Sequence, residues 1–117
     1  MEVSVATTSA KWLLLTYVSV RLHPVPFGVA LFVPSEERLV FRFREDTGFI
    51  NPSDLDVLSG TSALFASILA AHGARKTFEW MESSLSNTVR VEGPFEISTT
   101  DPVAELDVLY RRHVEST

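Results

Sequence analysis

The sequence contains no cysteine, and its five glycines are spread singly along the chain. Without cysteine there can be no disulfide bond, no thiolate nucleophile and no cysteine-ligated zinc. Single glycines cannot form the G-x-G-x-x-G or G-x-x-x-x-G-K-[ST] loops that hold nucleotide phosphates. We therefore predict no metal site and no cofactor.

The sequence also lacks short catalytic motifs. His23, His72 and His113 lie far apart, and none belongs to an H-x-x-x-H, H-E-x-x-H or H-x-H pattern. No G-x-S-x-G nucleophile elbow is present. The acidic pairs fall in predicted turns or in a first helical turn, where capping and solubility explain them: Glu36 with Glu37, Glu45 with Asp46, and Asp54 with Asp56. We predict no catalytic residue, which favours a non-enzyme.

Long apolar runs are missing as well. The longest near the start, Trp12 to Leu15, is too short to cross a bilayer, and no charged leader with a cleavage site precedes it. A net charge of -5 disfavours a protein that mainly grips nucleic-acid phosphates. The chain has 117 residues, 45% of them hydrophobic, which is typical of one globular domain. We expect this domain to span residues 11–117, after a flexible N-terminal segment over residues 1–10. We also expect the protein to be cytoplasmic and to make no membrane contact.

Three segments have the composition and alternation of strands: residues 12–22, 27–33 and 38–44. In the first, Val18, Val20 and Leu22 alternate with polar residues and are expected to face inward. In the third, Leu39, Phe41 and Phe43 alternate with arginines. Short connections between consecutive strands favour an antiparallel meander.

The second half predicts helices. Asn51 and Pro52 announce a helix that ends near Ser59, and Gly73 ends a second helix over residues 61–72. We interpret this second helix as a core helix whose buried face is Leu64, Phe65, Ile68, Leu69 and His72. Two further elements are predicted: a helix over residues 75–85 and a strand region over 87–97. A closing helix begins at Asp101–Pro102, and its apolar face consists of Val103, Leu106, Tyr110 and Val114. The fold class is α+β: a three-stranded meander and a later strand or hairpin packed against three or four helices.

The outward face of the predicted sheet is the first candidate site. Period-two alternation places Arg38, Arg42 and Arg44 opposite the phenylalanines, and Tyr17 and Arg21 face outward if the first strand buries its valines. Forked arginine donors beside an aromatic ring can hold a phosphate, a carboxylate or single-stranded nucleic acid. The other interpretation is a solvated face whose arginines are balanced by nearby Glu and Asp residues.

A second candidate is the segment from Trp80 to Arg90. Trp80 lies off the apolar stripe of its helix, and Asn87 and Arg90 follow shortly after it. A tryptophan next to polar side chains and an arginine is typical of a protein interface. The alternative is a tryptophan that completes the core where the helix meets the sheet.

The early pattern resembles an uncharacterised bacterial group, the domain of unknown function 3037 family. The residues that carry the likeness are the aromatic-rich segment 12–22, the glycine-centred segment with Gly28 and Val29, the segment 38–44 and the stretch 85–87. Pro24, Val25 and Pro26 depart from the family pattern, in which a charged residue and an asparagine are usual. The resemblance implies no established activity, but some members are encoded near HipA-like toxin kinases, which implies a regulatory or partner role.

The sequence thus favours a non-catalytic module that binds a protein partner or a second copy of itself. The alternative is a small nucleic-acid or phosphate-ligand binding domain that uses the arginine-bearing sheet face.

Overall fold

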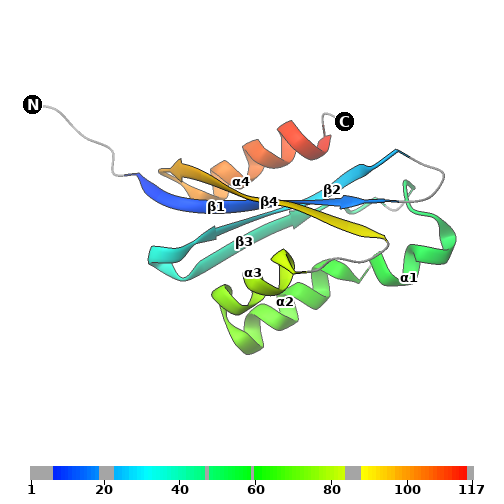
Figure 1. The fold of residues 1–117 in the computed structure, drawn as a ribbon, viewed down its shortest axis with the longest axis horizontal. Helices are drawn as coiled ribbons and strands as arrows, with labels where there is room; N and C mark the ends of the chain where they lie inside the picture. Colours follow the sequence, from blue (N-terminus) through cyan, green and yellow to red (C-terminus); the bar gives the residue numbers. More distant parts are fainter. Residues whose placement is uncertain (1–6, 19–22, 47, 59, 84–87, 116–117) are drawn as a thin grey trace, which may run out of the picture.

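The computed structural model describes residues 7–18, 23–46, 48–58, 60–83 and 88–115 and has an α+β fold (Figure 1). Its centre is a four-stranded antiparallel sheet in the order β3-β2-β1-β4. The strands are β1 (Thr8–Tyr17), β2 (Val25–Val33), β3 (Arg38–Phe43) and β4 (Val89–Thr99). The last strand therefore joins the main sheet, beside the first.

Helices cover both faces of this sheet (Figure 1). On one face lie α1 (Leu55–Leu58), α2 (Thr61–His72) and α3 (Ala74–Glu82). On the other lies α4 (Pro102–Tyr110), which continues as a π-helical turn, η3 (Arg111–Glu115). Two short 3-10 turns, Pro34–Glu36 and Pro52–Asp54, precede β3 and α1. None of the helices in the described segments is long and apolar enough to cross a membrane.

The two helical layers enclose two separate hydrophobic cores. On the α2–α3 side, Leu13, Leu15 and Phe32 are buried together with Phe78 and Met81 of α3. On the α4 side, the core consists of Ala10, Leu14, Val29, Leu31, Val33, Leu106, Leu109, Tyr110 and Val114. Successive residues of a strand point to opposite faces, so β1 and β2 supply apolar side chains to both cores.

The first strand differs from the prediction. It begins at Thr8 and not at Trp12, so residues 8–10 belong to the sheet. It ends at Tyr17, and Leu13, Leu15 and Tyr17 share one buried face. Of the residues expected to face inward, Val18 follows the strand, while Val20 and Leu22 lie outside the described residues, as does Arg21.

The other elements agree more closely with the sequence patterns. Asp101 caps α4 as expected: its Oδ1 accepts from the amides of Val103 and Ala104 at 3.1 and 3.2 Å. The amide of Gly73 donates to the carbonyl of Leu69 at the end of α2. Asn51 precedes a helical segment but its side chain forms no cap, and Leu85 lies outside the described residues.

The predicted core face of α2 is confirmed only in part. Phe65 is buried and Ile68 and Leu69 pack against the core, partly buried, but Leu64 is 57% exposed. His72 is also exposed. In α4, Val103 is 46% exposed, although Leu106, Tyr110 and Val114 are buried as expected.

Gly28 of β2 is a point of close packing between β2 and β3. It pairs with Phe43 across the strands, and a Cβ atom placed on Gly28 would lie 2.0 Å from Phe43 Cδ1. The ring of Phe43 cannot move away freely, because it packs against Phe27, Phe41 and Phe65. Only a residue without a side chain fits beneath this ring.

We expect Gly28→Ala to lower the free energy of unfolding by about 1–3 kcal/mol, the usual cost of overpacking a core. Gly48→Ala is the matched control, because nothing lies within 4 Å of its Cβ position and it should change stability by less than about 0.5 kcal/mol. Urea unfolding followed by circular dichroism measures both values. Equal stability of the two variants would contradict the packing argument.

Candidate binding surfaces

A cleft of about 410 Å³ lies at the C-terminal end of β3. Four phenylalanines contribute to its wall: Phe27, Phe41, Phe43 and Phe49. Arg44 and Asp46 line it too. The cleft therefore combines aromatic walls with one ion pair, a composition that suits an apolar group carrying a polar end.

The arginines at this end of β3 are held by carboxylates. Arg44 forms a forked pair with Asp46, with Nε–Oδ1 at 2.9 Å and Nη2–Oδ2 at 2.6 Å, and its guanidinium lies 4.4 Å from the ring centroid of Phe49. Asp46 raises the pKa of Arg44 through this hydrogen bond, and Arg44 lowers the pKa of Asp46. The pair keeps both groups charged and directs them at each other.

Arg42 is exposed on the α4 face and contacts the helix there. Its guanidinium lies 4.1 Å from the ring centroid of Tyr110 and donates to Asp107 Oδ1 at 3.1 Å, with Glu115 at 3.9 Å. Burial raises the pKa of Tyr110 even though Arg42 opposes the shift. Arg38, at the other end of β3, is 4.0 Å from Glu36. Of the arginines predicted for this face, the three that the structure describes, Arg38, Arg42 and Arg44, are thus each in an ion pair, as in the interpretation of a balanced sheet face.

Tyr17 does not accompany these arginines, and the prediction that it faces outward is wrong. It is fully buried on the opposite face of the sheet, with Leu13 and Leu15. Its hydroxyl donates to Asp54 Oδ2 at 2.6 Å and accepts from the amide of Asn51 at 3.2 Å. Tyr17 therefore fastens the segment before α1 to the sheet. Desolvation and the bond to Asp54 raise its pKa.

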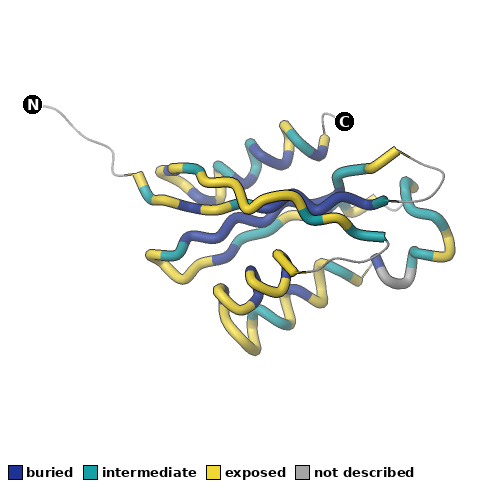
Figure 2. The backbone as a smooth tube through the Cα atoms, in the orientation of Figure 1, coloured by how far each residue is buried: buried dark blue, intermediate teal, exposed yellow. Residues whose placement is uncertain are grey.

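The most unusual surface is the outer side of α2. Its exposed side chains include no Asp, Glu, Lys or Arg. We call six of them together the α2 outer surface: Ala63, Leu64, Ala66, Ser67, Ala70 and Ala71. α2 is apolar around its circumference and not on one stripe, which is typical of a helix that is covered on all sides. In Figure 2 much of this helix is nonetheless coloured as exposed.

Trp80 of α3 lies next to this surface. It is 46% exposed, and its ring centroid is 5.2 Å from that of His72 at the end of α2. Trp80 is therefore not the core residue of the alternative interpretation. Asn87, the next residue predicted for this interface, lies outside the described residues. Arg90 is exposed on β4, opposite Thr16 of β1. β4 is the edge strand of the sheet next to β1.

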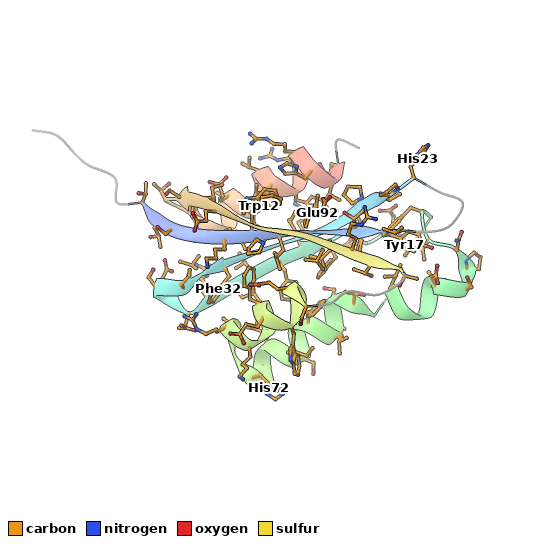
Figure 3. All side chains as sticks on the ribbon, in the orientation of Figure 1. Trp12, Tyr17, His23, Phe32, His72 and Glu92 are labelled. Atoms are coloured by element: carbon orange, nitrogen blue, oxygen red, sulfur yellow. The ribbon has the colours of Figure 1, made fainter. Side chains whose placement is uncertain are left out.

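The histidines do not assemble into a site. His23 lies at one end of the molecule and His72 at the outer side of the α2–α3 layer (Figure 3). The ring of His113 lies 4.8 Å from that of Trp12 on the α4 face. In the segments that the structure describes, no three His, Asp or Glu side chains are grouped as metal ligands would be.

No family model, curated protein or solved structure matches this chain. Any function of this chain therefore has to be inferred from the chemistry of its candidate surfaces. Sequence reasoning missed Leu64 as a surface residue because it assigned one face of α2 to the core. The signal was present in the composition: residues 60–71 contain no charged residue and are apolar or small on every side.

We expect Tyr17→Phe to melt roughly 5–10 °C below the parent protein at pH 8, because it leaves the partly buried Asp54 carboxylate without its phenol donor. The pKa of Tyr17 is raised above 10.0, so this stabilisation is complete below pH 10 and is lost as the pH rises through the raised value. The difference in melting temperature between the parent and Tyr17→Phe should therefore narrow above pH 10.

Thermal unfolding followed by circular dichroism at several pH values between neutral and alkaline measures this difference in melting temperature. Tyr110→Phe is the matched control, because it removes the other tyrosine with a raised pKa and leaves the Tyr17–Asp54 bond in place. A gap between parent and Tyr17→Phe that stays constant through alkaline pH would show that Tyr17 does not titrate as described.

Proposed function

We propose that this domain is a non-catalytic module that binds another protein through the α2 outer surface. The observation that carries the proposal is the exposure of a charge-free, apolar helix as an outer layer of the fold. A regulatory role with a protein partner, which the resemblance to the domain of unknown function 3037 family implies, is part of the same proposal.

The composition of α2 supports a partner with an apolar surface. Soluble proteins usually place charged residues on the solvent side of a surface helix, and α3 does so with Arg75, Lys76, Glu79 and Glu82. On its solvent side α2 instead has four alanines, namely Ala63, Ala66, Ala70 and Ala71. Small side chains allow another element to approach the helix backbone closely, and Leu64 projects from it as a large apolar anchor.

Trp80 and His72 extend the surface at the C-terminal end of α2. Tryptophan is enriched at the centres of protein interfaces because it buries a large apolar area and still offers one hydrogen-bond donor. The contact between the Trp80 and His72 rings links α3 to α2. The partner surface that we propose is accordingly apolar, with a polar group near its rim.

The arginines of β3 do not favour the nucleic-acid alternative. Arg38, Arg42 and Arg44 each face a carboxylate of this chain, and a phosphate would have to displace that carboxylate. The alternative stays a prediction, and a low-salt titration with single-stranded DNA and RNA tests it.

Site-specific photocrosslinking in the native host tests the proposal. A photoreactive residue at position 64 should give an adduct with one protein, because this side chain is at the centre of the proposed interface. The same residue at position 103 is the matched control: Val103 is 46% exposed and apolar but lies on α4, across the sheet. The same adducts from both positions would overturn the proposal.

With the crosslinked partner purified, Leu64→Asp should weaken binding at least tenfold, and Val103→Asp should leave the Kd within about twofold. Both residues are exposed, so neither change should lower the free energy of unfolding by more than about 0.5 kcal/mol. Calorimetric titration gives the Kd values. A Leu64→Asp variant that folds and binds as tightly as the parent would contradict the assignment.

A further inference from the structure

We infer that β4 pairs antiparallel with β4 of a second copy of this chain, so that the two sheets form one continuous sheet. The two-fold axis passes between the Val91 residues of the two copies, and Arg90 of each copy faces Glu92 of the other. This inference is separate from the α2 outer surface, which lies on a different element.

β4 is an exposed edge of the sheet. It is the last strand in the order β3-β2-β1-β4, and seven of its eleven residues are exposed. Figure 2 shows the strand mostly in the colour of exposed residues. β3, at the opposite edge, differs because helices contact it from both faces and its arginines are paired with local carboxylates. β4 is therefore the edge more open to another strand.

The hydrogen bonding to β1 decides which backbone groups of β4 point outward. The amide of Val18 donates to the carbonyl of Thr88 at 2.8 Å, and in the same register Thr16 faces Arg90 and Leu14 faces Glu92. In an antiparallel pair, alternate residues direct both backbone groups at the partner strand. Arg90 and Glu92 thus bond toward β1, and Val91 directs its N–H and C=O away from the sheet.

This geometry fixes the centre of the self-pairing. Two Val91 residues placed opposite each other exchange two hydrogen bonds, from the N–H of each to the C=O of the other. The neighbouring pair is then Arg90 opposite Glu92, twice, at positions where side chains approach most closely. A self-pairing centred closer to the C-terminal end of β4 would include Pro94, which has no N–H to donate to the other copy.

The opposite charges of Arg90 and Glu92 lie directly across from each other when two copies pair in this register. Arg90 and Glu92 are both exposed and point to the α4 side of the sheet, since they face Thr16 and Leu14. Neither forms an ion pair with another residue in the described part of the chain, in contrast to Arg38, Arg42, Arg44 and Arg75. The two-fold arrangement provides each with an opposite charge.

Sedimentation velocity of the full chain, from micromolar to millimolar concentration at low salt, tests the inference. We expect a reversible monomer–dimer equilibrium that weakens as salt is added, because exposed ion pairs are screened. A monomer at every concentration would overturn the inference. It would leave the photocrosslinking at position 64 unaffected, so the two proposals fail separately.

Charge variants distinguish this register from any other dimer. Glu92→Arg places arginine opposite Arg90 in both pairs and should weaken self-association about tenfold or more. Glu96→Arg is the matched control, because it changes the net charge equally but lies beyond Pro94. Since either change brings the net charge closer to zero, non-specific repulsion would predict tighter association for both.

The double variant Arg90→Glu/Glu92→Arg restores both pairs with reversed sign, and its dimer should return to within about threefold of the parent Kd. Hydrogen exchange supplies an independent measurement: the Val91 amide should gain protection with rising protein concentration in the parent but not in Glu92→Arg. Equal association of Glu92→Arg and Glu96→Arg, or a double variant as weak as Glu92→Arg, would overturn the inference.

Discussion

Burial of both faces of the two central strands is the constraint on which the rest of the fold depends. β1 and β2 carry apolar side chains toward both sides, so a sheet covered on one side would leave about half of them in water. Antiparallel sheets often have one wet face, but this one does not. Both helical layers are needed, and they leave little of β1 and β2 exposed.

The same constraint explains where the polar residues of the sheet lie. With α4 packed on one face, the exposed side chain of Arg42 extends beside the helix to Asp107, over the ring of Tyr110. On the other face, the hydroxyl of Tyr17 is buried and bonds to Asp54. The buried hydroxyl of Tyr17 is thus matched by groups on the segment that covers it, as a buried polar group requires.

The layers also determine which surfaces stay open. The α2–α3 layer covers the sheet with α3 and with Phe65, Ile68 and Leu69 of α2, which leaves the α2 outer surface facing solvent without charged residues. The α4 layer contacts β2 and β3, and β4 lies at the edge away from it. An apolar helix and an uncovered strand edge are both surfaces that another chain can bury, and they lie on different elements of the fold.

The amino-acid sequence by itself determined the elements and their approximate limits: three early strands from alternation, helix starts from Pro52 and the Asp101 cap, and the end of α2 at Gly73. These signals are local, because caps, turns and side-chain alternation act over a few residues. Only the tertiary structure decided that β4 lies beside β1, that Tyr17 points inward, and that Leu64 is exposed. Those outcomes depend on contacts between residues far apart in the chain, and an apolar helix or strand has the same sequence pattern whichever face is finally covered.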